Sequence, residues 1–213
     1  MMPLWSLLRK DYRMKKQIIF ATGNKDKMRE IREIMADVDV EVLSMKEAGI
    51  VVDVVEDGTT FEENSLIKAK AIAEHTDAIV LADDSGLEID YLDKAPGVYS
   101  ARFMGEDTSY VIKNQALIDK LEGVPKEERT ARFVCAIGAV LPNKETLVIR
   151  ETMEGYIGDH AEGENGFGYD PIFFLAEFGC SSAALSREQK NEISHRGKAL
   201  RAMKDILISR EIL

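Results

Sequence analysis

Residues 131–157, ARFVCAIGAVLPNKETLVIRETMEGYI, contain two long runs rich in apolar and β-branched side chains. The runs cover 131–141 and 146–157, and the intervening Pro-Asn-Lys-Glu at 142–145 has the composition of a turn. This pattern predicts a β-hairpin. Strands of this length indicate that the fold is built on a long twisted sheet.

Shorter strand and helix signals lie on both sides of the hairpin. β-rich runs predict strands at 17–22, 40–43 and 78–82, with a return strand at 87–91 after a turn-like segment. Apolar residues at helical spacing predict helices around 28–35, from a capping box at 60 to about 75, at 107–121 and from about 194 onwards. The inner side of the 107–121 helix is expected to carry Val111, Leu117, Ile118 and Leu121. Together these elements predict a mixed α/β domain with helices on the faces of its sheet.

The length and composition are those of one soluble domain. The chain has 213 residues, of which 45% are apolar, so it is long enough to bury a core, and we expect a single domain over 14–213. Residues 1–13 have two interpretations, an extension ahead of a start at Met14 or a helix that packs Trp5 and Leu8 on the domain. No apolar run is long enough to span a bilayer, and the first residues lack signal-peptide features, so we expect no membrane association.

Charge and cysteine usage exclude further classes. The formal net charge of -10 argues against a nucleic-acid partner, because such domains usually carry a basic face. Cys135 and Cys180 are too few for a disulfide scaffold and lack the spacing of a zinc site. A reducing, cytoplasmic location fits best.

The first chemical motif lies where the strand at 17–22 meets the next helix. Thr22-Gly23-Asn24 is followed by Lys25 and Lys27. Glycine permits close backbone approach, and free amides at a helix start attract phosphate. The alternative is an ordinary strand-to-helix turn with solvated lysines. No Walker A sequence occurs in the chain, which argues against a standard P-loop nucleotidase.

Carboxylates and their neighbours form two further groups. Asp83 and Asp84 are predicted at the end of a buried strand, and Glu56 lies in an acidic turn, so two carboxylates could hold Mg²⁺. Asn64 and Lys68 are four residues apart on one helix and share a face. The alternatives are turn chemistry at Asp-Ser-Gly and a solvated surface pair.

A fourth group combines aromatic and charged side chains near the C-terminus. Its members are Phe167, Gly168, Tyr169, Asp170, Lys190, His195 and Arg196. An aromatic ring can stack on a base, while charged groups can read the edge of the base. The alternatives are core or rim aromatics and a histidine in a helix cap region. The combination of a phosphate loop, a metal site and a base-reading edge predicts a nucleoside triphosphate pocket.

Six motifs in order carry a resemblance to a known family. They are Thr22-Gly23-Asn24-x-x-Lys27, Phe61-x-x-Asn64-x-x-x-Lys68-Ala69, Ala82-Asp83-Asp84-Ser85-Gly86-Leu87, the 95–102 segment APGVYSAR, Gly166-Phe167-Gly168-Tyr169-Asp170-Pro171, and Ser194-His195-Arg196. From about residue 16 to the C-terminus the chain resembles the inosine triphosphate pyrophosphatase family. The resemblance implies Mg²⁺-dependent hydrolysis of a deaminated purine triphosphate (ITP, dITP or XTP) to the monophosphate and pyrophosphate. It also implies nucleotide-pool cleansing by a homodimer, and an elongated α/β fold whose two lobes enclose a central cleft.

The resemblance also implies roles for single residues. Thr22, Gly23, Asn24 and Lys27 would hold the phosphates with Lys68 beside them, and Lys25 and Asp26 would belong to the same substrate-binding loop. Glu56 and Asp84 would hold the Mg²⁺, and Ser85 would line the substrate site. Asp84 would be the general base, with Asp83 able to share that work. Phe167 would stack on the purine beside Gly168 and Tyr169. Asp170, Lys190, His195 and Arg196 would read the edge of the purine.

Two other functions compete with this one. A nucleotide-binding regulatory module would use the same pocket without turnover, but acidic residues help to bind an anionic triphosphate only where a metal is needed. A metal-dependent nuclease is the second, and the acidic charge with no basic stripe weighs against it.

Overall fold

The computed structural model describes residues 15–213. Residues 1–14, and with them the predicted N-terminal extension, lie outside the described part. The described chain forms a seven-stranded sheet in the order β2-β1-β3-β4-β5-β6-β7 with five α-helices. The expected mixed α/β fold on an elongated sheet is confirmed.

The strands and helices have the following bounds. The strands are β1 (Lys16–Phe20), β2 (Val40–Ser44), β3 (Ile79–Ile89), β4 (Thr130–Val140), β5 (Thr146–Ile157), β6 (Phe173–Leu175) and β7 (Cys180–Ser181). The helices are α1 (Lys25–Ile34), α2 (Phe61–Ala73), α3 (Tyr110–Lys120), α4 (Arg187–Ile193) and α5 (His195–Ser209). No helix in the described range is long and apolar enough to cross a membrane.

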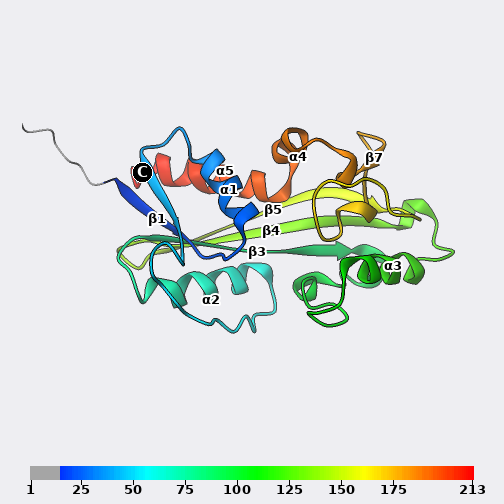
Figure 1. Cartoon of the computed structure of the whole chain (residues 1–213), viewed down its shortest axis with the longest axis horizontal. Helices are drawn as coiled ribbons and strands as arrows, with labels where there is room; N and C mark the ends of the chain where they lie inside the picture. The colour runs from blue at the N-terminus through cyan, green and yellow to red at the C-terminus, as the bar shows by residue number, and fades with distance from the viewer. Residues whose placement is uncertain (1–14) are drawn as a thin grey trace, which may run out of the picture.

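Helices cover both faces of the long strands. In Figure 1, α1, α4 and α5 lie above β3, β4 and β5, α2 lies below them, and α3 lies below their far end. Side chains of α5 such as Met203 pack on Ile137 and Leu81 in one core, while Ile72 of α2 packs on Val80 from the other face. A third core joins Leu117 of α3 and the segment around β6 to the far halves of the strands.

The central strand β3 differs from its prediction. A strand ending at 82, a turn and a return strand were expected, but β3 is continuous from Ile79 to Ile89 and pairs antiparallel with β4 from Val80 to Ile89. This continuous pairing overrides the turn preference of Asp-Ser-Gly, because β-propensity depends strongly on context. Gly86 is required by crowding, since a Cβ there would lie 2.5 Å from the carbonyl oxygen of Gly97. Asp83 and Asp84 therefore lie in the middle of a strand.

The unequal lengths of β1 and β3 create the key feature of the sheet. β1 pairs parallel with β3 only from Ile18 to Phe20, and its last partner is Leu81. β3 continues to Ile89, so its outer edge passes beyond the end of β1. In open α/β sheets, ligands bind in the crevice outside the carboxyl ends of strands. The loop after β1 is thus placed beside the free edge of β3.

The helices agree with the pattern except at two places. α3 begins at Tyr110 after an N-cap at Ser109, and Val111 is 80% exposed instead of facing inward. Val111 lies six residues before the buried Leu117, and at 3.6 residues per turn that spacing points to another face. α4 was not predicted; it directly precedes α5, from which Ser194 separates it.

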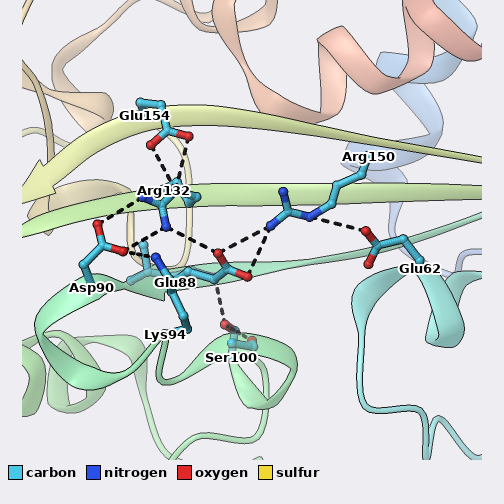
Figure 2. A network of polar contacts seen from close by, with 10 residues as sticks. Glu62, Glu88, Asp90, Lys94, Ser100, Arg132, Arg150 and Glu154 are labelled. Carbon is cyan, nitrogen blue, oxygen red and sulfur yellow. Dashed lines mark hydrogen bonds and ion pairs between the residues drawn. The ribbon is translucent and has the colours of Figure 1, made fainter.

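A network of ion pairs covers the α2 face of the long strands beyond α2 itself (Figure 2). Arg132 of β4 contacts Asp90 at 3.0 Å and Glu154 at 3.0 Å. Arg150 of β5 contacts Glu88 of β3 at 3.3 Å and reaches the first turn of α2. These carboxylates therefore serve a cross-strand network that is separate from the groups at the end of β1.

Gly138 in β4 tests the close approach of α2 to the sheet. A Cβ at Gly138 would lie 2.9 Å from backbone atoms of Ser65 and Leu66 in α2. Gly138→Ala should destabilise the fold by about 1–3 kcal/mol, although alanine is otherwise the better strand residue. The measurement is urea unfolding, with Val148→Thr at the register partner of Gly138 as a control that should change little. Equal stability of Gly138→Ala and the parent would contradict the close packing.

Candidate active site

The turn after β1 is held by its own side chains. Thr22 Oγ1 accepts a hydrogen bond from Asn24 N at 3.1 Å, and Asn24 Oδ1 accepts one from Lys27 N at 3.2 Å, which caps α1. Gly23 is exposed, and nothing lies within 4 Å of where its Cβ would be. The turn thus presents an open backbone at a helix start, where an anion can approach.

Asp83 collects cations beneath this turn. Its buried carboxylate contacts Lys27 Nζ at 2.8 Å and Arg196 Nε at 3.3 Å, and accepts a hydrogen bond from Ser85 Oγ at 3.2 Å. Burial favours a higher pKa, but the charges of Lys27, Arg196 and Lys68 outweigh it and hold the pKa of Asp83 well below its usual range. Asp83 is therefore ionised and neutralised by its neighbours.

Asp84 points to the opposite face of β3, because side chains alternate along a strand. It accepts hydrogen bonds from Asn64 Nδ2 at 3.0 Å and from Ser85 N at 2.9 Å. Burial, followed by the nearby carboxylates of Glu56 and Asp83, raises the pKa of Asp84 to about 6 despite the opposing effects of Asn64 and Lys68. A carboxylate with such a pKa can accept a proton near neutral pH.

Lys68 connects the side chain of Glu56 to the main chain of β3 at Asp83. Its Nζ lies 3.0 Å from Glu56 Oε1 and donates to the main-chain oxygen of Asp83 at 2.9 Å. Asn64 adds a second connection, because its Oδ1 accepts a hydrogen bond from Gly58 N at 2.8 Å while its Nδ2 donates to Asp84. The loop that carries Glu56 is thereby tied to Asp84.

The donor set around Asp84 fits a hard divalent cation. Mg²⁺ takes oxygen ligands and is commonly bound by one or two carboxylates together with substrate phosphates and water. In the described range no group of three or more His, Cys, Asp or Glu side chains could form an all-protein cage. Burial is the main cause of the raised pKa of Asp84, and the charge of Glu56 adds to it; a cation held by Glu56 and Asp84 would relieve that repulsion.

A cavity of about 600 Å³ lies on the Asp83 side of β3. Phe167 is half-exposed in it, with Lys190 Nζ 5.5 Å and Arg196 Cζ 6.0 Å from the ring centroid. A volume of this size and an accessible aromatic ring suit a planar ligand. The predicted residues in its wall are Asn24, Lys27, Ser85, Phe167, Gly168, Tyr169, Asp170, Lys190, His195 and Arg196.

Asp170 and Tyr169 build the wall of this cavity. Buried Asp170 accepts hydrogen bonds from Phe167 N at 2.8 Å and Ser182 Oγ at 3.0 Å and pairs with Lys190. The Tyr169 hydroxyl donates to the main-chain oxygen of Ser100 at 2.7 Å. Both side chains therefore have a structural role in the cavity wall. The base-reading role expected for Asp170 stays a prediction.

His195 and Arg196 follow the Ser194 N-cap of α5. The buried His195 ring stacks on Phe133 with centroids 5.0 Å apart, and its Nδ1 has no hydrogen-bond partner. Burial, then the charges of Arg196 and Lys190, lowers the pKa of His195 well below its ordinary value, so the ring is neutral. Arg196 is tied to Asp83 and also contacts Glu30 at 3.5 Å.

The predicted residues thus divide into two groups, and Asp83 contacts members of both: Lys27 and Arg196 through its side chain and Lys68 through its main chain. The cavity wall holds the residues named above, whereas Glu56, Lys68 and Asp84 form the group on the α2 side of β3. Thr22 and Gly23 lie in the turn beside both groups, Lys25 is the first residue of α1, and the side chain of Asp26 is outside the described part of the structure.

Sequence reasoning missed several residues of the cleft. Asn64 was noted as a neighbour of Lys68, but its bond to Asp84 could not be derived. Glu30 lies three residues after Lys27, a helical spacing that could have indicated a shared face. Missed residues in the cavity wall include Glu30, Ser100, Tyr110, Phe133, Asn165, Arg187 and Asn191.

Relatives share this architecture over nearly the whole chain. A dITP/XTP pyrophosphatase of Caldanaerobacter subterraneus is 48% identical over 195 residues, which cover 91% of this chain and 97% of the relative. A dITP/XTP pyrophosphatase of Clostridium perfringens is 46% identical, and the match covers 90% of this chain and 97% of the relative. The solved Ham1 protein of Staphylococcus aureus has a TM-score of 0.84 at 40% identity, covering 92% of this chain and 100% of its own.

A HAM1 protein structure from Coxiella burnetii has a TM-score of 0.85 at 37% identity and covers 91% of this chain and 99% of its own. The profile described as the Ham1 family matches residues 18–206. These matches confirm the resemblance that the motifs predicted. The chain therefore belongs to the Ham1 family.

Proposed function

We propose that this protein hydrolyses non-canonical purine nucleoside triphosphates (ITP, dITP and XTP) to the monophosphate and pyrophosphate, and so cleanses the nucleotide pool. The observation that supports the proposal is the group of Asp84, Glu56 and Lys68 at the free edge of β3, where Asn64 donates to Asp84 and the pKa of Asp84 is raised to about 6. The cavity with Phe167 adjoins it. Relatives that are 46–48% identical are named dITP/XTP pyrophosphatases, which supports the same substrate class.

Different residues of the chain bind the phosphates, hold the metal and accept the proton. Backbone amides of the Thr22–Lys27 turn and the side chain of Lys68 bind phosphate oxygens. Mg²⁺, held by Glu56 and Asp84, supplies charge neutralisation for the phosphates when bound. Asp84 orients the attacking water and accepts its proton. Asp83 keeps Lys27 and Arg196 in place from beneath.

The cavity wall accounts for selection of the base. Phe167 stacks on the purine, while Lys190, His195 and Arg196 lie along its edge. A donor aimed at a 6-keto oxygen loses its partner when adenine offers an amino group, and a buried polar group without a partner is costly. The neutral ring of His195 and its unpartnered Nδ1 support such a contact.

Several finer properties complete the proposal. The metal is Mg²⁺, the protein works as a homodimer in the cytoplasm, and residues 14–213 act as one domain without nucleic-acid or membrane partners. The all-oxygen donor set supports the choice of Mg²⁺. The free thiols of Cys135 and Cys180 suit a reducing compartment.

The two alternative functions, a regulatory module and a nuclease, agree less well with the site and the charge of the chain. A module that only binds nucleotides has no use for a carboxylate with a raised pKa, and the relatives carry enzyme names. A nuclease is disfavoured by the formal net charge of -10.

Product analysis tests the reaction itself. ITP, XTP, ATP and GTP are incubated with the protein, each with and without Mg²⁺, and the products are separated. We expect monophosphate and pyrophosphate from ITP and XTP in the presence of metal only. ATP should not be cleaved, because the cavity wall favours a 6-keto purine; GTP keeps the 6-keto group, so its rejection would report a separate contact near position 2 of the base. Binding without cleavage would favour the regulatory module, and orthophosphate as product would show that another bond is broken.

Asp84→Asn tests the proposed base. The amide keeps the shape of the side chain but cannot accept the proton, so kcat should fall by about 10²–10⁴-fold, while calorimetry should show that ITP still binds. Glu88→Gln is a matched control, since it changes a carboxylate on the same strand and face within the ion-pair network. Near-normal turnover by Asp84→Asn would refute the assignment.

A further inference from the structure

Helix α4 forms part of the cavity wall with little anchorage in the core. None of the residues Arg187–Ile193 is fully buried, and Ile193 at the C-terminal end packs on the core only partly buried. An isolated helix of this length is not stable in water, because nucleation is costly and few hydrogen bonds repay it. The position of α4 therefore depends on contacts along its sides and at its ends.

The C-terminal end of α4 is fixed to the body of the domain. Arg201 of α5 donates to the main-chain oxygens of Asn191 at 3.1 Å and Glu192 at 2.6 Å. Lys190 pairs with buried Asp170 behind Phe167. These contacts lie in the later part of the helix. Ahead of α4 the main chain is fixed at buried Leu185, whose oxygen accepts a hydrogen bond from Asn165 Nδ2 at 3.0 Å. The exposed side chains of the first turn are the part that these contacts do not hold.

An anchor for these side chains comes from α1, on the other side of the cavity. Glu33 Oε1 lies 2.6 Å from Arg187 Nη2, and Glu33 Oε2 accepts a hydrogen bond from Asn191 Nδ2 at 3.4 Å. Arg187 and Asn191 line the cavity from α4, and Arg29 and Glu30 line it from α1. Glu33 thus joins the two walls along one rim.

We propose that Glu33 is a positioning residue that holds the first turn of α4 against α1 and slows the release of bound nucleotide. The proposal rests on the proposed function in one respect, namely that the cavity takes a purine nucleotide. With the contact broken, the two walls separate more easily at this rim. With the contact made, Phe167 and Lys190 stay opposite α1 and the ligand is retained for longer.

The size of the effect follows from the exposure of the pair. The side chains of Arg187 and Glu33 are 45% and 49% exposed, so the pair is screened by water and salt. Exposed pairs typically contribute up to about 1 kcal/mol, which corresponds to a rate change of up to about fivefold. The effect should shrink as the ionic strength rises.

A distant ion pair provides a matched control. Arg210 and Glu145 are 2.6 Å apart and 48% and 46% exposed, and they join the end of α5 to the β4–β5 turn. Stopped-flow release of a fluorescent ITP analogue in EDTA should be about two- to fivefold faster for Glu33→Gln at low salt. Glu145→Gln should release the analogue at the parent rate. Equal rates for Glu33→Gln and the parent would overturn the proposal.

A charge swap separates positioning from direct contact, because Arg187 itself lines the cavity. The double variant Glu33→Arg/Arg187→Glu recreates the pair in reverse and should restore slow release. If release stays fast although the double variant melts at the parent temperature, Arg187 acts on the ligand directly and the positioning role is wrong.

Hydrogen exchange tests the contact without any ligand. In the nucleotide-free protein, amides of α4 should exchange faster in Glu33→Gln than in the parent, and should be unchanged in Glu145→Gln. Faster exchange in a protein that binds no purine nucleotide would refute the proposed function but uphold the contact. Unchanged exchange in Glu33→Gln would refute the contact whatever the protein binds.

Discussion

The buried carboxylate of Asp83 is the contact on which the cleft depends. Removing an ion from water costs several kcal/mol, and in β3 this cost is offset by Lys27 from α1 and Arg196 from α5. The main-chain oxygen of the same residue accepts a hydrogen bond from Lys68 of α2. Three helices from both faces of the sheet thus converge on one residue, at the point where β1 has ended. Loss of the charge would leave two cations without their partner and would loosen both α1 and α5.

The alternation of side chains along β3 gives its two neighbouring aspartates different properties. Asp83 faces two cations and has a lowered pKa, whereas Asp84 faces Asn64 and Glu56 on the other side and has a pKa raised to about 6. The sequence alone left open how the two residues divide the work. The geometry supports a structural role for Asp83 and a chemical role for Asp84, because only the second can change its protonation near neutral pH. One strand therefore carries both Asp83, which supports the site, and Asp84, the group proposed to react.

Local patterns predicted what depends on local interactions. The 131–141 and 146–157 strands agree with β4 and β5 to within one residue, and the capping box at Thr60 is present. The break predicted in β3 was wrong because its pairing with β4 joins residues about 50 apart in the sequence. The contact of Glu33 with Arg187 spans 154 residues, and Asn64 reaches Asp84 over 20. Motifs could indicate which residues take part in the site, but only the pairing of distant segments determines which of them touch.

The two halves of the cleft differ in how firmly they are held, and this difference bears on how a substrate is used. The proposed phosphate side rests on β3, which is paired with β4 along nearly its whole length, and a reactive group needs such a rigid support. The proposed purine side includes α4, which has no fully buried residue and is held by polar contacts and by the partly buried Ile193. A triphosphate that spans both sides can therefore order the softer wall while the chemical groups stay fixed. Selection of the base and cleavage of the phosphate can then vary separately, because they depend on different elements of the fold.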